Sequence, residues 1–142
     1  MPRVVVLTGK AIRAYFEEAL AEAGASLATW VVLYGVERGG WDNQRDLAND
    51  LRIQGATLTR HLDRMERDGL IVRTRDPDDR RQMRVGLTPE GREVFRRLKS
   101  IAQRTGKRAM TGVSADDQAQ LRRVLDRIRA NVGGDRADER SA

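Results

Sequence analysis

The spacing of apolar residues changes along the middle of the chain, and this change constrains the fold more than any other feature. In residues 54–68 the apolar side chains recur as on one face of a helix; they are Leu58, Leu62 and Met65. In residues 82–87 every second residue is apolar, which is typical of a half-buried strand; these residues are Met83, Val85 and Leu87. This stretch of chain therefore forms a helix first and β-structure second.

Capping and turn residues predict the neighbouring elements. Asn43 begins a short helix, and a turn at Arg52-Ile53 separates it from the helix at 54–68. Leu70–Arg75 is the expected partner strand, joined to residues 82–87 by the turn Asp76-Pro77-Asp78-Asp79. Further helices are expected at about residues 7–23, 26–38, 88–110 and 114–132.

These elements predict a mainly α-helical protein with a small β-hairpin wing, that is, a winged helix-turn-helix between N-terminal and C-terminal helices. We expect N-terminal helices in residues 1–42, the winged helix-turn-helix in 43–88, C-terminal helices in 89–132 and a disordered tail in 133–142. A chain of 142 residues can bury a core without disulfides or metal ions.

The residue inventory excludes several classes of function. The chain has no cysteine and one histidine, His61, so we expect no metal site, and no cofactor motif is present. No nucleophile–base pair and no phosphate-binding loop is visible, which argues against an enzyme. The apolar runs are short, such as Val4–Leu7, so we expect a soluble cytoplasmic protein with no membrane partner.

The charge of the chain favours a polyanionic partner. The formal net charge is +6, and most of the excess lies in residues 89–112, which hold seven basic and two acidic side chains. Excess arginine is also common in proteins from GC-rich genomes, so charge alone does not decide between DNA binding and other functions.

The helix at 54–68 carries residue types that read DNA. With its apolar face inward, it presents small, hydroxylic and basic side chains outward; the candidate DNA-binding residues are Gln54, Gly55, Ala56, Thr57, Thr59, Arg60 and Arg64. An arginine can form two hydrogen bonds with a guanine edge in the major groove. A solvated amphipathic helix would show the same pattern, so this helix is not decisive by itself.

Four motifs occur in order between Gln44 and Glu93, namely QRDLANDL, LDRMERDGLI, DPDDRR and LTPEGRE. With this order and spacing, most of the chain resembles the MarR family of winged helix-turn-helix regulators. The resemblance implies a transcriptional repressor that binds double-stranded DNA as a homodimer, with an inverted-repeat operator to match the two-fold symmetry. It also implies a dimer held by the N- and C-terminal helices and a small-molecule effector site between those helices and the winged region.

Three wing residues are assigned by this resemblance. Arg81 matches the arginine that enters the minor groove, Arg80 lies beside it, and Asp79 matches the acid that orients it. Turn formation alone would also explain the aspartates at 76, 78 and 79.

The chain departs from the family pattern at three positions. Arg52 stands in the turn where glycine is usual, which strains the backbone if the residue is left-handed. Gln54 stands where Ser or Thr would cap the helix, and Gly55 stands where a longer polar side chain often reads a base. Base readout is therefore expected chiefly from Thr57 and Arg60.

Apolar stripes on the terminal helices predict dimer contacts. The stripe on the last helix has no partner within a lone winged domain, and the first helix is also apolar on one side. The candidate dimerisation residues are Leu7, Ala11, Leu121, Val124, Leu125 and Ile128.

Two interpretations remain open for the aromatic residues of the first two helices. They can be plain core, or they can line a pocket for a small aromatic or phenolic acid; the candidates are Arg13, Tyr15, Phe16, Trp30 and Tyr34. Arg104 is an alternative partner for the acid. His61 is interpreted as a structural histidine rather than a DNA contact or a switch.

One other function class fits the sequence. A nucleoid-type or protein-interaction module could use the same winged fold without operator specificity. DNA binding that depends on salt but not on base sequence would favour that alternative.

Overall fold

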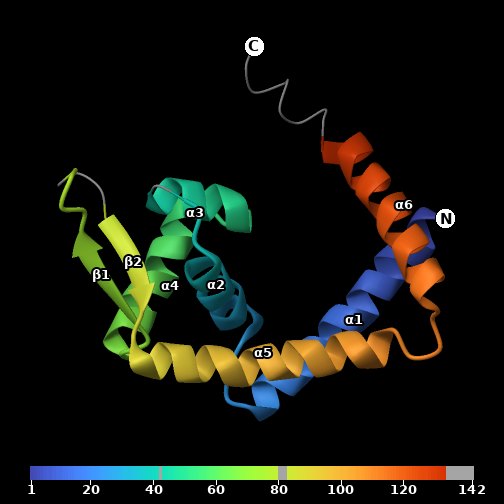
Figure 1. The fold of residues 1–142 in the computed structure, drawn as a ribbon, viewed down its shortest axis with the longest axis horizontal. Coiled ribbons are helices and arrows are strands. Elements are labelled where there is room, and N and C mark those ends of the chain that lie inside the picture. The colour runs from blue at the N-terminus through green and yellow to red at the C-terminus, as the bar shows by residue number, and fades with distance from the viewer. Residues whose placement is uncertain (42, 80–82, 134–142) are drawn as a thin grey trace. The chain divides into compact units, whose positions relative to one another are not determined.

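The computed structural model describes residues 1–41, 43–79 and 83–133. Their elements, shown in Figure 1, are α1 (Pro2–Glu22), α2 (Leu27–Arg38), α3 (Gln44–Leu51), α4 (Gly55–Arg67), β1 (Ile71–Arg75), β2 (Met83–Leu87), α5 (Pro89–Ala109) and α6 (Ala115–Gly133). The chain divides into two compact units, Met1–Thr105 and Gly106–Ala142. The expected fold class, mainly α with a hairpin wing, is confirmed.

Most helix boundaries follow the capping residues of the sequence. The Ser26 side chain accepts a hydrogen bond from the Thr29 amide at 3.1 Å, and the Asn43 side chain accepts one from the Asp46 amide at 3.0 Å. Gly69 follows α4 with a φ of +72°, a conformation that suits glycine at a helix end.

The first helix is longer than the apolar spacing indicates. It begins at Pro2 rather than near Leu7, because proline is favoured in the first turn, where its missing N–H would have no helical partner. The residues Val4 and Val6 of this added turn are more than half exposed in the chain. They belong to the helix without contributing to its core.

The hydrophobic core lies within the first unit. It combines the inward faces of α2, α3, α4 and α5 with the hairpin; its buried members include Leu33, Leu47, Leu58, Leu62, Met65, Ile71, Val85 and Leu98. The apolar faces expected on α3 and α4 are thus confirmed. Gly35 on α2 allows close packing, since a Cβ there would lie 2.8 Å from a Leu51 methyl group.

The wing is a two-stranded antiparallel sheet. Ile71 pairs with Leu87, Arg73 with Val85 and Arg75 with Met83. Ile71, Val85 and Leu87 are buried, whereas Met83 is 36% exposed, so only the base of the hairpin contributes to the core.

The start of α5 is held against the α4–β1 corner. The Thr88 hydroxyl donates to the Gly69 carbonyl at 2.6 Å and accepts from the Gly91 amide at 3.0 Å, and the Thr88 amide donates to the Leu70 carbonyl at 3.1 Å. At Gly91 an added Cβ would lie 1.9 Å from the Leu70 carbonyl oxygen. The threonine and glycine of the LTPEGRE motif therefore have a structural explanation.

The second unit holds the end of α5 and all of α6. None of the α6 residues, which are all described, is buried. Its exposed apolar side chains are Leu121, Val124, Ile128 and Val132. The Ser114 side chain accepts from the Asp117 amide at 3.1 Å and so begins the helix as expected.

Across the described residues, no single helix is long and apolar enough to span a membrane. Only α1 and α2 taken together reach the required length and composition, and they are bent by 89° at their junction.

Candidate nucleic-acid interface

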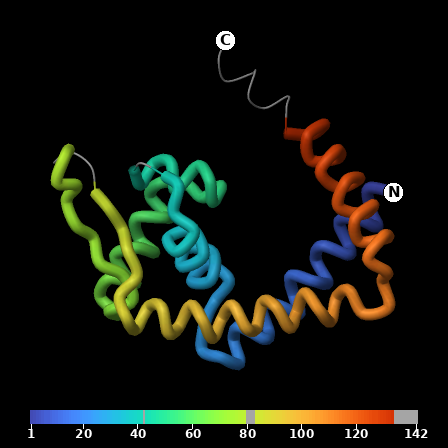
Figure 2. Tube along the Cα trace, in the orientation of Figure 1, coloured from blue at the N-terminus to red at the C-terminus, as the bar shows by residue number. Residues whose placement is uncertain are grey.

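The turn between α3 and α4 is held by backbone hydrogen bonds. The Arg52 amide donates to the Asn49 carbonyl at 3.1 Å, and the Ile53 amide donates to the Ala48 carbonyl at 2.9 Å. Arg52 has φ 53° and ψ 41°, so it meets the left-handed condition under which an arginine strains this turn. Gln54 precedes α4 without forming a side-chain cap. The tube in Figure 2 follows this turn from α3 into α4.

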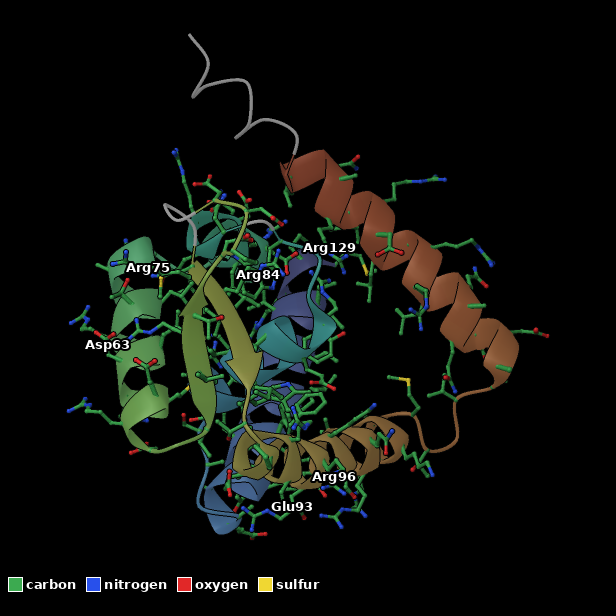
Figure 3. The ribbon with its side chains drawn as sticks, turned by 60° about the vertical axis from the view of Figure 1, so that its left-hand side comes forward. Asp63, Arg75, Arg84, Glu93, Arg96 and Arg129 are labelled. Atoms are coloured by element: carbon green, nitrogen blue, oxygen red, sulfur yellow. The ribbon has the colours of Figure 1, made fainter. Side chains whose placement is uncertain are left out.

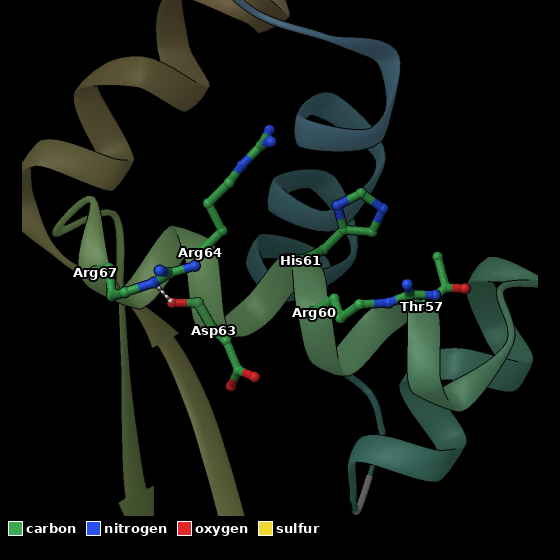
Figure 4. A pocket seen from close by; sticks show the side chains of 6 residues that line it. All are labelled: Thr57, Arg60, His61, Asp63, Arg64 and Arg67. Atoms are coloured by element: carbon green, nitrogen blue, oxygen red, sulfur yellow. Dashed lines mark hydrogen bonds between the residues drawn. The ribbon is translucent and has the colours of Figure 1, made fainter.

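The outer face of α4 is rich in arginine. Arg60, Arg64 and Arg67 are exposed, and Thr57 is half-buried beside them. They line an open depression of about 450 Å³ together with His61 and Asp63, shown in Figure 4. Leu58, Leu62 and Met65 are buried on the opposite face, so the arginines point away from the hydrophobic core.

The amino-terminal half of α4 is joined to α3 through side chains. The Gln44 amide donates to the Thr59 hydroxyl at 2.7 Å, and that hydroxyl donates to the Gly55 carbonyl at 3.0 Å. Gln54, Gly55 and Ala56 are exposed at this end of the helix. Thr59 thus has structural partners, whereas its neighbours Ala56 and Arg60 face solvent.

His61 is half-buried on α4. In Figure 4 it projects to the same side of the helix as Arg64, whereas Asp63 projects to the opposite side. It lines the arginine-rich depression, so the structure places it beside the outer face as well as at the border of the core.

An arginine at the base of the wing joins β1 to α4. The Arg73 guanidinium donates to Glu66 at 2.6 and 3.0 Å and to Asp63 at 2.7 Å, while its amide also donates to Glu66. The hydrogen bonds from Arg73 lower the pKa of Glu66, although burial acts in the opposite direction. The Arg73 side chain is only 20% exposed. This contact fixes β1 relative to α4.

The wing turn is organised by Asp76. One carboxylate oxygen accepts from the amides of Asp78 and Asp79 at 2.8 and 3.4 Å, and the other accepts from the Arg84 side chain at 2.6 Å. These bonds, led by that from Arg84, lower the pKa of Asp76. Asp76 therefore forms the turn, as its sequence context allows. Arg80 and Arg81 lie outside the described residues.

Two further arginines belong to the wing. Arg75 ends β1 and Arg84 lies in β2, both with exposed side chains. Figure 3 labels them along the hairpin, with Asp63 on the neighbouring α4. The sequence interpretation did not select them, although their place beside the DPDDRR turn was a usable signal.

The aromatic residues form a cluster that joins α1, α2 and α5. Trp30 stacks on Phe95, with ring centroids 5.7 Å apart and planes at 7°, and Phe16 meets Trp30 edge-on at 6.0 Å. Tyr34 lies 5.5 Å from Trp30 and is 46% exposed. Neither Phe95 nor Lys99, whose ammonium lies 5.9 Å from the Phe95 ring, was selected from the sequence.

The arginines considered as partners for an acidic ligand differ in their surroundings. Arg13 is paired with Glu17 at 2.9 Å, and Tyr15 and Arg104 are exposed. Lys99, whose ammonium lies above the Phe95 ring, places a positive charge at the aromatic cluster.

The sequence matches known regulators over the same region. Residues 26–83 match the MarR family model. The chain is 33% identical over 123 residues to the uncharacterized HTH-type transcriptional regulator YdgJ of Bacillus subtilis (strain 168), covering 87% of this chain and 73% of that protein. The chain belongs to the MarR family.

Solved structures of MarR-family regulators share the fold. The transcriptional regulator PA3341 is 33% identical, with a TM-score of 0.82, and the match covers 94% of this chain and 98% of that one. BpsR of Bordetella bronchiseptica, whose DNA binding is regulated by 6-hydroxynicotinic acid, has a TM-score of 0.77. At 21% identity, over 90% of this chain and 91% of BpsR, that likeness shows the fold alone.

Membership of the MarR family establishes the general function of the protein. The protein is a DNA-binding transcriptional regulator and not an enzyme. In a winged helix-turn-helix the second helix enters the major groove, and α4 is the second helix of that motif in this chain.

Proposed function

We propose that the protein is a cytoplasmic repressor that binds an inverted-repeat operator as a homodimer and is released by a small aromatic acid or phenol. One observation carries the operator-binding part of this proposal: the exposed Thr57–Arg67 face of α4, beside a hairpin whose base Arg73 fixes to that helix. Such a pair of elements can contact the major groove and the adjacent minor groove together.

The residues of α4 have different roles in this proposal. Arg60 reads a guanine edge, and Thr57 contacts a neighbouring base or thymine methyl group. Gln54, Gly55, Ala56 and Arg64 approach the bases or the flanking backbone. Thr59 acts by holding α4 to Gln44, because its hydroxyl already has two partners. At the wing, Asp79, Arg80 and Arg81 complete the minor-groove contact.

The dimer is proposed from apolar surface that the chain leaves uncovered. On α1, Val4, Leu7 and Ile12 are at least 40% exposed, and Ala11 lies on the same helix. On α6 the stripe comprises Leu121, Val124, Leu125 and Ile128, and none of these side chains is buried. Contiguous apolar faces of this kind mark protein interfaces, and a second copy is the partner that an inverted repeat requires.

The effector is proposed from the aromatic cluster. Phe16, Trp30 and Phe95 supply ring surfaces, Tyr34 is partly open to solvent, and Lys99 brings a cation to the same place. An aromatic carboxylate matches this combination of stacking surface and positive charge. The regulation of BpsR by 6-hydroxynicotinic acid supports the same ligand class.

Selection of bound sites from a random DNA pool tests the operator proposal. We expect an inverted repeat whose half-site centres are about 10 base pairs apart. Arg60→Ala should then cost about 1–3 kcal/mol and relax the preference at one base pair in each half-site. Arg81→Ala should weaken binding to most sequences alike. If the pool yields no consensus and binding varies only with salt, the protein is a nucleoid-type module instead.

Tryptophan fluorescence and operator affinity, measured together, test the effector. A phenolic acid should quench tryptophan fluorescence and weaken operator binding, and operator DNA should weaken the acid's binding by the same factor. Trp41 is the second tryptophan and lies outside the cluster, with its indole N–H donating to the Gly35 carbonyl. Trp41→Phe should therefore keep the quenching, and Trp30→Phe should remove it. Quenching without a change in DNA affinity would leave the cluster as plain core.

A further inference from the structure

Arg52 holds a backbone conformation that an arginine disfavours. Among the non-glycine residues that the structure describes, it alone has a positive φ. At φ 53° and ψ 41° the Cβ of any L-residue crowds its own backbone, and glycine avoids this contact.

The turn needs this conformation but not an arginine side chain. The paired hydrogen bonds from the Arg52 amide to Asn49 and from the Ile53 amide to Ala48 end α3 with one residue, Arg52, in the left-handed conformation. Ile53 then packs against the core. Glycine would form the same bonds without the crowding. The fold therefore gives no reason for a large side chain at this position.

The Arg52 side chain also has no structural partner in the described part of the chain. It is exposed and makes no hydrogen bond or ion pair there. By contrast, Arg38 pairs with Asp50, and Arg73 pairs with Glu66. A residue that costs stability and forms no hydrogen bond or ion pair through its side chain among the described residues is a candidate for a contact with another molecule.

We propose that Arg52 binds a DNA phosphate at the edge of the major groove. In a helix-turn-helix the first helix crosses the DNA backbone and the amino-terminal residues of the second contact bases. Arg52 lies between these two elements, where the phosphates border the groove. Its permanent charge and planar donors suit a phosphate oxygen. The protein thus gives up conformational stability at this turn for a sequence-independent contact with DNA.

The wild-type chain and three full-length variants separate the effect of charge from that of backbone conformation. The wild type and Arg52→Lys have a positive charge and a Cβ that crowds the backbone. Arg52→Gln keeps the Cβ but is neutral, and Arg52→Gly is neutral and has no Cβ. For each, the affinity for a labelled duplex of mixed sequence is measured between about 50 and 200 mM salt, and Tm is measured without DNA. The duplex needs no operator, because phosphate contacts do not depend on sequence.

We expect the salt slope to follow charge and Tm to follow conformation. Gln and Gly should each lower the slope by about 0.9 for every Arg52 that contacts a phosphate, and should weaken binding roughly tenfold per contact. Lys should keep the slope. Gly alone should raise Tm, by about 3 °C.

Arg123→Gln is the matched control. Arg123 is an exposed arginine of α6, and its removal lowers the net charge by the same amount. It should leave the slope unchanged. If Gly and Gln bind the duplex with the wild-type slope and affinity, or if Arg123→Gln lowers the slope equally, the phosphate contact is disproved.

Discussion

The winged region and α6 bury their apolar residues very differently. In residues 43–88 the apolar side chains of α3, α4 and the hairpin base meet one another, and Leu47, Leu58 and Leu62 are fully buried. In α6 the side chains of Leu121, Val124 and Ile128 are 39–47% exposed. The difference separates a region whose apolar side chains pack into the core of the first unit from a helix whose apolar stripe stays exposed in the single chain.

The same contrast appears in the polar contacts. The winged region is held by ion pairs between elements, such as Arg73 with Glu66 and Arg84 with Asp76. An ion pair on α6, between Arg129 and Asp126, lies within one helix and is exposed. Exposed pairs of this kind contribute little to stability. Substitutions in the winged region should therefore act through the chain's own fold, and those on α6 through assembly.

The largest expected effect is at the junction of the wing and α5. Gly91→Ala places a methyl group against the Leu70 carbonyl, which must move and break its bond from the Thr88 amide. We expect a loss of about 4 kcal/mol in the free energy of unfolding, measured by urea denaturation. Gly106→Ala, in the same helix with open space around it, should instead stabilise by up to about 1 kcal/mol. Equal effects of the two variants on the free energy of unfolding would contradict the close packing of Gly91 against the Leu70 carbonyl.

Local elements were the most predictable part of this protein. Ser26, Asn43 and Ser114 bond to amides one turn ahead, so their caps depend only on neighbours in sequence. The start of α1 was less predictable, because Val4–Leu7 is a continuous apolar run that shows no helical spacing. The close approach of Gly91 to Leu70 joins separate elements, and a lone glycine in LTPEGRE does not indicate which backbone lies against it.

The next effect compares a core residue with the α6 stripe. Leu62→Ala should cost about 3 kcal/mol through the cavity it leaves, yet keep the wild-type mass in light scattering. Ile128→Asp should leave the winged region folded and change the mass from about twice 16.0 kDa to about 16.0 kDa, because a charge cannot be buried unpaired in an interface.

Arg123→Asp, at another position of α6, controls for the introduced acid. It should remain dimeric, since its side chain lies away from the Leu121–Ile128 stripe in the helical repeat. A monomeric wild-type protein, or an Ile128→Asp variant that stays dimeric, would contradict a dimer held by this helix.

The candidate site was predictable where it depends on one helix face and less so where it joins elements. Arg60 and Arg64 are exposed on α4, as its period requires. Thr59 was selected as a DNA contact, but its partner Gln44 lies in the preceding helix, so no local pattern shows that bond. Phe95 is distant from Trp30 in sequence, and only the packing of α5 on α2 brings the rings together.

The smallest expected effect is on the pH dependence of Tm, through the Glu66–Arg73 contact between α4 and the wing. The pKa of Glu66 is lowered in the folded protein, chiefly by the Arg73 side chain. A carboxyl group with a lowered pKa contributes stability above its unfolded pKa, and this contribution is lost as pH falls through the folded pKa. Below about pH 5 the wild-type Tm should therefore decline, and Glu66→Gln should decline less steeply because it has no proton to gain there. Asp126→Asn, which removes a carboxylate from the exposed ion pair of α6, is the control with the same change of charge. If the two variants change the dependence of Tm on pH equally, the carboxylates of the winged region do not contribute more than those of α6, and the contrast between the two regions holds for apolar burial only.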